Sequence, residues 1–147
     1  EDAPAYPKAI RAILDADLIV IGPGSLYTSV LPILLVPDLR AAIQSASAVK
    51  VYVCNVATQS GETAGYDVMD HVDALTNHVG GDVFSIVLAN GNIIPDRSLG
   101  GGAEWVHPPE SEPDRYRLIL ADLVDGQYPW RHDPIKLAQA LMALIGD

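Results

Sequence analysis

The stretch ADLIVIGPGSLYTS, residues 16–29, decides the fold, because an apolar segment runs directly into a loop of Gly, Pro, Ser and Thr. Residues 18–21 are rich in β-branched side chains without polar alternation, which is typical of a parallel strand covered on both faces. Gly22 and Gly24 allow the backbone to turn sharply and to approach a ligand closely. Four hydroxyl groups follow the turn, on Ser25, Tyr27, Thr28 and Ser29. We therefore predict a loop that binds a phosphate or another anion through neutral donors.

The loop does not match either of the two common phosphate-binding motifs. A P-loop requires a Lys after its glycines, and the dinucleotide fingerprint requires a third Gly at the start of the helix. This segment contains neither. A Gly-x-Gly turn that serves backbone geometry alone is the alternative interpretation.

Composition restricts the classes of protein to which the chain can belong. Its 147 residues, 49% of them hydrophobic, predict one domain or part of a larger one, with a substantial core. The formal net charge of −10, with nine dispersed Lys and Arg residues, argues against nucleic acid or an anionic membrane as the main partner. Cys54 is the single cysteine and lies in an apolar run, which predicts a buried, inert thiol and a reducing cytoplasm.

Two further features concern the surroundings of the chain and its extent. Neither an apolar run of membrane-spanning length nor a signal peptide is recognised, so we expect no membrane association. The chain begins at Glu1 rather than Met, and we expect it to be a piece of a longer protein.

Helices and strands are predicted to alternate along most of the chain. Strands are expected over residues 18–21, 49–56, 84–89 and 117–124, with a short one over 104–107. Helices are expected over residues 7–15, 37–45, 66–79 and 134–145, the last capped by Asp133 and Gly146, with at best a short helical turn over 30–36. The alternation predicts an α/β fold, with a Rossmann-like, mainly parallel sheet flanked by helices, as a single partial domain over residues 1–147.

A second polar loop follows the predicted strand 49–56. Its polar side chains belong to Asn55, Thr58, Gln59, Glu62 and Thr63. Because the carboxyl ends of parallel strands meet at the same edge of a sheet, we expect this loop and the Gly-Ser-Thr loop to form one cleft. Two alternatives stay open: Thr63 caps the next helix, and Glu62 is a solvated carboxylate in that helix's first turn.

Three other groups of residues bear on the chemistry of the chain. His71 and His78 lie two helical turns apart, which does not suit a metal site, although His71 is expected to reach the rim of the cleft. Arg131 is a candidate for a bidentate contact with a phosphate or carboxylate, with an ordinary surface arginine as the alternative. The three glycines at 100–102 predict a flexible turn. No catalytic residue is assigned.

The two loops, together with Tyr66 and Asp70-His71, strongly resemble the YvcK/CofD-like family. Arg131-His132-Asp133 fits the same family, and the resemblance covers most of the chain. One arm of this family consists of cytoplasmic gluconeogenesis factors, which bind a UDP-linked amino sugar and support cell-wall synthesis and cell shape. The other arm is 2-phospho-L-lactate transferase, which joins a phospholactyl group to a deazaflavin.

The loop Gly-Pro-Gly-Ser-Leu-Tyr-Thr-Ser is similar to that of the first arm. The resemblance implies that Gly24, Ser25, Thr28 and Ser29 line a nucleotide-sugar cleft, with Asn55, Thr58 and Glu62 opposite and Arg131 at a phosphate. Family members also carry a Gly-rich strand and turn that this chain lacks, and many carry a Tyr-bearing helix where residues 98–102 stand here. The chain therefore resembles only the C-terminal half of a family member, and its open sheet edges suggest a homo-oligomer.

Three hypotheses follow for the function. The first is a regulatory module that binds a nucleotide sugar such as UDP-N-acetylglucosamine, without turnover, and that acts on a cell-wall biosynthesis enzyme. The second is a phospholactate transferase, in which Asp or Glu residues hold a divalent metal. The third is a half-domain that forms oligomers and binds nothing by itself.

Overall fold

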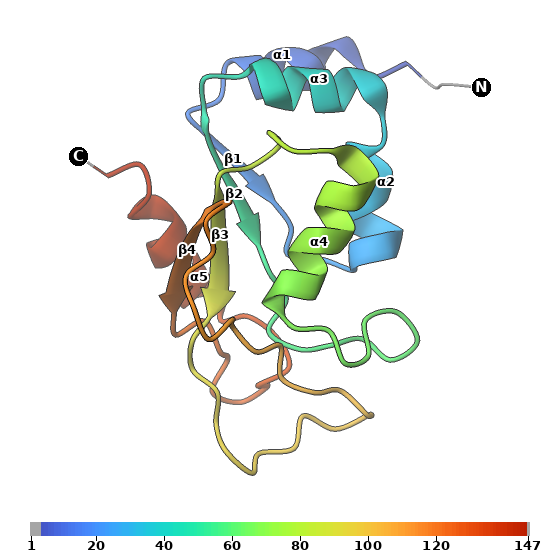
Figure 1. Ribbon diagram of the computed structural model, residues 1–147. Helices are drawn as coiled ribbons and strands as arrows, with labels where there is room; N and C mark the ends of the chain where they lie inside the picture. The colour runs from blue at the N-terminus through green and yellow to red at the C-terminus, as the bar shows by residue number, and fades with distance from the viewer. Residues whose placement is uncertain (1–3, 147) are drawn as a thin grey trace.

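A computed structural model describes residues 4–146 of the chain (Figure 1). The elements, in order, are α1 (Pro7–Leu14), β1 (Leu18–Ile21), the π-helix η1 (Leu26–Val30), α2 (Leu31–Leu34), α3 (Pro37–Ser45), β2 (Val49–Val53), α4 (Val68–Val79), β3 (Ile86–Asn90), β4 (Arg117–Ala121) and α5 (Pro134–Met142).

The strands form one sheet in the order β1-β2-β3-β4, and each neighbouring pair is parallel. One face carries a large apolar core to which η1, α2, α3 and α4 contribute. The other face carries a smaller cluster around Val51, Val53 and Leu88, against which α5 packs. The prediction of an α/β fold with a parallel, helix-flanked sheet is confirmed.

Local capping explains where two of the helices begin. At the start of α4, the Asp70 N–H donates to the Asp67 carboxylate at 2.8 Å, and the Asp67 N–H donates to the Asp70 carboxylate at 2.9 Å. This capping box replaces the proposed Thr63 cap, which is wrong. Asp133 caps α5 as predicted, by accepting from the N–H groups of Ile135 and Lys136. The C-cap of α5 is Ala143 and not Gly146.

Other predicted boundaries also change. The segment after Gly24, expected as a loop, forms η1 and then α2. Pro32 does not interrupt α2, because it lies in the first turn, where its missing N–H has no cost. The strand predicted over residues 49–56 ends at Val53. The expected strand over residues 104–107 is reduced to a single bridge between Ala57 and Trp105.

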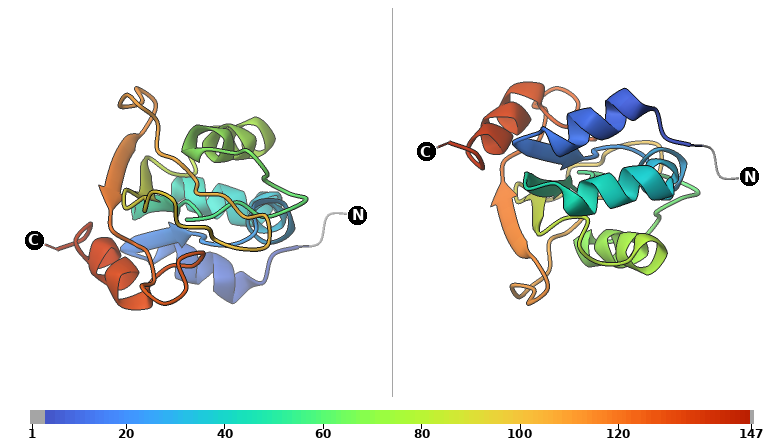
Figure 2. Two further views of the ribbon diagram at one scale, coloured as in Figure 1. Left: turned by 90° about the horizontal axis from the view of Figure 1, so that it is seen from below. Right: turned by 90° about the horizontal axis from the view of Figure 1, so that it is seen from above.

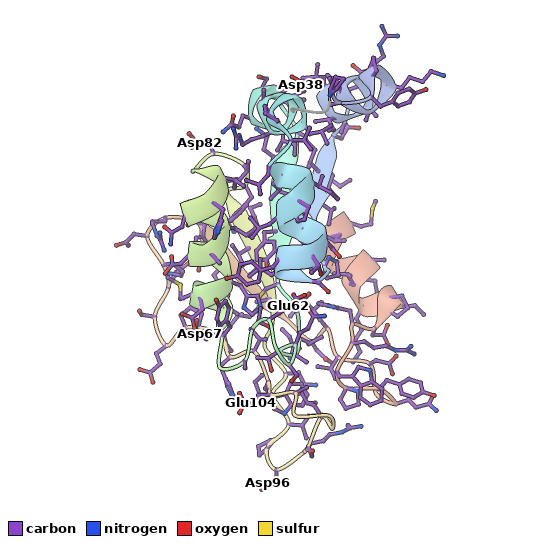
Figure 3. All side chains as sticks on the ribbon, turned by 90° about the vertical axis from the view of Figure 1, so that its right-hand side faces the viewer. Asp38, Glu62, Asp67, Asp82, Asp96 and Glu104 are labelled. Carbon is purple, nitrogen blue, oxygen red and sulfur yellow. The ribbon has the colours of Figure 1, made fainter. Side chains whose placement is uncertain are left out.

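The parallel arrangement gathers the loops that follow the strands at one end of the sheet. In Figure 1 the long segments after β2, β3 and β4 all lie below the arrowheads. Figure 3 shows Glu62 and Glu104 at this end, whereas Asp38 and Asp82 lie at the opposite end. The topology thus concentrates polar loops at the carboxyl edge, as expected for a ligand-binding α/β sheet.

Within residues 4–146, none of the helices is both long and apolar enough to cross a membrane by itself. The segments 26–34 and 37–45 reach the length and apolar composition of a membrane span only when taken together, and they are bent by 74° relative to each other.

Candidate functional site

A cleft of about 770 Å³ opens at the carboxyl edge of the sheet. Its walls come from residues 23–25 after β1, 55–59 after β2, 99–101 and Ala103 after β3, and 130–132 after β4. The predicted convergence of the first two loops is therefore observed, and the loops after β3 and β4 enlarge the same space. Arg131 is the one Lys or Arg among the described lining residues, and Asp and Glu are missing from that set.

Asn55 joins the first two loops. Its side-chain oxygen accepts from the Gly24 N–H at 3.2 Å, and its side-chain NH₂ donates to the Gly24 carbonyl at 3.0 Å. Both polar atoms of the amide are thus bonded to one backbone unit in a partly buried position. Asn55 acts here as a clamp on the Gly-rich turn, which fixes the shape of the cleft floor.

A second link between the loops runs through Gln59 and Ser25. The Gln59 side-chain NH₂ donates to the Ser25 hydroxyl at 2.9 Å. The Gln59 side-chain oxygen is buried and has no hydrogen-bond partner within the described residues. An unpaired buried acceptor is costly, and this oxygen is not exposed to the cleft in the structure.

Thr58 connects the cleft to the loop after β3. Its N–H donates to the Glu104 carbonyl, and its hydroxyl accepts from the Glu104 N–H, both at 2.9 Å. Thr58 is buried, so its hydroxyl positions the neighbouring loop. Thr58 also forms part of the cleft wall.

The helix η1 begins directly after the wall that the first loop gives to the cleft. Ser25 precedes this helix, and its carbonyl accepts from the N–H groups of Ser29 and Val30. The N–H groups of the first turn of a helix have no partner within the helix, and the helix dipole favours an anion beside them. The residues of η1 do not line the cleft, so binding of a phosphate at this helix end stays a prediction.

Arg131 contributes the positive charge of the cleft. Its Nε donates to the Asp125 carboxylate at 3.1 Å, and its guanidinium carbon lies 4.4 Å from the centre of the Tyr128 ring. These contacts use one edge and one face of the guanidinium plane. The remaining N–H groups are available for the bidentate contact that Arg makes with phosphates.

Four of the predicted residues lie beside the cleft and not on its walls. The Thr28 hydroxyl donates to the Glu62 carboxylate at 3.1 Å, and the other carboxylate oxygen of Glu62 is buried without a partner in the described chain. The Tyr27 hydroxyl hydrogen-bonds with the Tyr66 hydroxyl at 2.8 Å, and this bond, with burial, raises the pKa of Tyr27 to about 12. Ser29 faces a separate apolar groove.

Two predicted residues are structural. The Thr63 hydroxyl is fully buried and accepts from the Gln59 N–H at 2.9 Å, so it shapes the second loop from within. His71 is also fully buried, with Nδ1 at 2.7 Å from the Asp67 carbonyl and its ring edge-on to Tyr66. The structure therefore places His71 beneath the loop and outside the cleft wall. Gly22, with a φ of 77°, forms the turn that precedes the cleft.

Sequence reasoning missed three contributors to the cleft. Residues 99–101, predicted as part of a flexible turn, form one wall, although they lie far from the other walls in sequence. Trp130 and His132 flank Arg131 and also line the cleft. Their position next to Arg131 in the sequence was the signal that could have identified both residues. Burial lowers the pKa of His132, although a hydrogen bond with the Cys54 backbone opposes this change.

We expect the free energy of unfolding to fall as the pH is lowered from about 7.5 to about 5.5. Burial lowers the pKa of both His71 and His132 in the folded protein, so below their ordinary pKa the unfolded chain binds more protons. Urea titrations across this range measure the effect. A His71→Gln, His132→Gln double variant should flatten the dependence, and an equal dependence in this variant would contradict the assignment.

The described residues offer no cluster of three or more His, Cys, Asp or Glu side chains that could hold a metal ion. Burial raises the pKa of Cys54 to about 12, so its thiol stays protonated, as the prediction of an inert cysteine requires.

Comparison with known proteins places these features in context. The family model described as 2-phospho-L-lactate transferase CofD matches residues 1–141. The gluconeogenesis factor of Bacillus subtilis is 39% identical over 152 aligned residues, which cover 99% of this chain and 48% of that protein. The gluconeogenesis factor of Halalkalibacterium halodurans is 50% identical over 96 residues, or 65% of this chain and 30% of that protein.

A solved structure shows the same fold. The crystal structure of a UPF0052 family member from Bacillus halodurans has a TM-score of 0.85 and 39% sequence identity to this chain. The match covers 96% of this chain and 47% of the solved one. The chain thus spans about half the length of the relatives that it matches along nearly its whole length.

Proposed function

The chain belongs to the CofD family, and on that premise we propose that it is a regulatory module that binds a nucleotide sugar. The ligand in this proposal is a compound of the UDP-N-acetylglucosamine type. The biological role is control of cell-wall synthesis and cell shape during gluconeogenic growth, exerted in the cytoplasm on a cell-wall biosynthesis enzyme. Two relatives of this chain are named gluconeogenesis factors, and these names support the proposed role during gluconeogenic growth.

The single observation that carries the ligand class is the donor set of the cleft. Neutral residues of the first two loops line a space that carries one arginine and, among its described lining residues, no carboxylate. Such a lining suits a pyrophosphate, because the Ser25 hydroxyl and the Arg131 guanidinium can donate to its oxygens and no lining carboxylate repels it.

Calorimetric titration tests this proposal. We expect saturable heat with UDP-N-acetylglucosamine and weaker binding of UDP and of N-acetylglucosamine when each is added alone. A second titration uses GDP together with a deazaflavin and Mg²⁺, the ligands of the transferase arm. Binding of the second set, with no response to the UDP sugar, would overturn the proposal in favour of the transferase.

The second candidate rests on the description of the matching family model, a phospholactate transferase. A divalent metal serves that reaction in our second hypothesis, and the residues at the cleft do not fit it. The lining residues within 4–146 include no carboxylate, and Glu62 offers a single unpaired oxygen beside them. Hard cations such as Mg²⁺ prefer several oxygen ligands, one or two of them carboxylates. We therefore derive no catalytic step through a metal.

Replacing Arg131 with Lys should weaken binding of the UDP sugar about tenfold. The substitution keeps the positive charge and removes the planar pair of donors that a phosphate can engage. Arg11→Lys, on α1 and away from the cleft, is the matched control and should leave the affinity unchanged. Equal affinities of the two variants in the same calorimetric titration would exclude a bidentate role for Arg131.

A further inference from the structure

Trp130 is a large aromatic side chain on the wall of the cleft, and half of it is exposed. It lies in the loop between β4 and α5, which the left view of Figure 2 shows beside α5 at the carboxyl end of the sheet. Its exposed fraction is 50%, although tryptophan is on average a highly buried residue. Arg131 follows it directly and lines the same cleft, so the exposed indole belongs to the candidate site.

The loop that carries Trp130 is cross-linked by the hydrogen bonds of Asp125. One Asp125 carboxylate oxygen accepts from the N–H groups of residues 127 and 128, at 2.8 and 2.9 Å. The other oxygen accepts from Arg131 Nε at 3.1 Å, and the Asp125 N–H donates to the Arg131 carbonyl at 3.2 Å. Pro129 is buried, and its ring fixes φ directly before Trp130. The loop is therefore ordered without a ligand, which lowers the entropic cost of binding one.

Tyr128 supports both side chains that this loop gives to the cleft. The Tyr128 and Trp130 ring centroids are 5.3 Å apart and the ring planes meet at 63°, an edge-to-face contact that covers at most one face of the indole. The Arg131 guanidinium carbon lies 4.4 Å from the centre of the Tyr128 ring. Trp130 and Arg131 thus share one support, and aromatic surface lies beside a cation in the cleft wall.

We propose that Trp130 is the platform on which the nucleobase of the ligand stacks, while Arg131 holds the phosphate next to that base. This inference rests on the proposed function and assigns the base end of the nucleotide sugar to the loop between β4 and α5. Stacking on an aromatic side chain contributes to the affinity for any base, because every base has a π face. Val56 and Leu99 add apolar side chains to the same wall, which suits a flat, weakly hydrated ring.

The sugar ring is the competing occupant of Trp130, and the polar contacts of the cleft disfavour it. A bound sugar needs hydrogen-bonding side chains for its several hydroxyl groups. The Asn55 amide already uses both of its polar atoms on Gly24, and the Gln59 side-chain NH₂ donates to Ser25. The described lining residues also include no carboxylate. A base stacks without such partners, so this lining favours the base over the sugar.

Calorimetric titration of the 147-residue chain separates the two ends of the ligand, with UDP as one probe and N-acetylglucosamine 1-phosphate as the other. Trp130→Ala should weaken the affinity for UDP about tenfold, because the stacked face is lost. The affinity for N-acetylglucosamine 1-phosphate, which has no base, should stay unchanged. Trp130→Phe keeps an aromatic ring and should recover most of the affinity for UDP.

Ile135→Ala is the matched control for the loss of exposed apolar surface. Ile135 lies on α5, is 68% exposed, and is not among the described lining residues of the cleft. We expect this variant to bind both probes as the unaltered chain does. An equal loss of affinity for both probes in Trp130→Ala would contradict the stacking role, because it would show a general defect of the cleft.

Tryptophan fluorescence provides a second, direct measurement. The chain has two tryptophans, so Trp130 is the sole one in a Trp105→Phe background. The Trp105 indole N–H donates to the Arg97 carbonyl at 3.2 Å, and Trp105 is not among the described lining residues of the cleft. UDP should quench the emission of Trp130 with the dissociation constant that calorimetry gives, and N-acetylglucosamine 1-phosphate should not. Quenching by the sugar phosphate alone would overturn the proposal in favour of a sugar platform.

Failure of this inference and failure of the proposed function give different results. If the unaltered chain shows no heat with UDP-N-acetylglucosamine, the proposed function fails and the stacking role fails with it. If the unaltered chain binds this ligand, but Trp130→Ala keeps its full affinity for UDP, the stacking role alone is overturned.

Discussion

Gly22→Ala should lower the free energy of unfolding by about 3 kcal/mol, the largest effect expected of a Gly→Ala change at the described glycines. Gly22 has a φ of 77°, a region that residues with a Cβ rarely adopt. A Cβ at this position would also lie 2.9 Å from the Val53 carbonyl oxygen, closer than van der Waals contact permits. The turn between β1 and η1 therefore has two separate reasons to exclude a side chain.

Gly61→Ala separates these two reasons. Gly61 has a similar φ of 83°, but a Cβ there would meet nothing within 4 Å. This variant should lose only the conformational preference, about 1 kcal/mol. Urea denaturation of the three proteins, followed by circular dichroism, measures both values. Equal losses for the two variants would show that the backbone beside Val53 moves aside at no cost.

Asn55→Ala should be the most damaging change to the cleft. The substitution leaves the N–H and the C=O of Gly24 without their present partners in a partly buried position, which costs about 2 kcal/mol of stability. Because the Gly-rich turn loses its clamp, we expect affinity for the UDP sugar to fall at least about tenfold. Calorimetry and urea denaturation of the same variant measure the two effects.

Asn92→Ala is the matched control for this experiment. The Asn92 side chain donates one exposed hydrogen bond to Asp122, so its loss should cost little stability and no affinity. Asn55→Asp adds a further distinction, because it keeps the acceptor for the Gly24 N–H and places a negative charge beside the cleft. This variant should bind the anionic ligand more weakly than Asn55→Ala does. The opposite order would contradict an anion at this position.

The order and type of the main elements could be predicted from local patterns of residues. The uninterrupted apolar run of residues 18–21 indicated a parallel strand, and the Asp133-Pro134 pair indicated the start of α5. The expected cover of this strand on both faces is wrong, because β1 lies at the margin of the sheet and only Ile21 of its residues is buried. The loops at Gly22–Ser25 and Asn55–Thr58 were identified because parallel topology brings the carboxyl ends of strands together. These features depend on neighbouring residues or on a general rule of topology, so one sequence was sufficient.

What the sequence determined by itself is therefore the α/β class, the parallel sheet and the two loops that meet at its carboxyl edge. Only the tertiary structure decided that residues 99–101 and His132 complete the cleft, and that Thr63 and His71 are buried beneath it. The physical reason is the range of the interactions. Strand and helix patterns arise between residues a few positions apart, whereas the position of a long loop depends on distant partners, such as the Glu104 backbone that holds Thr58.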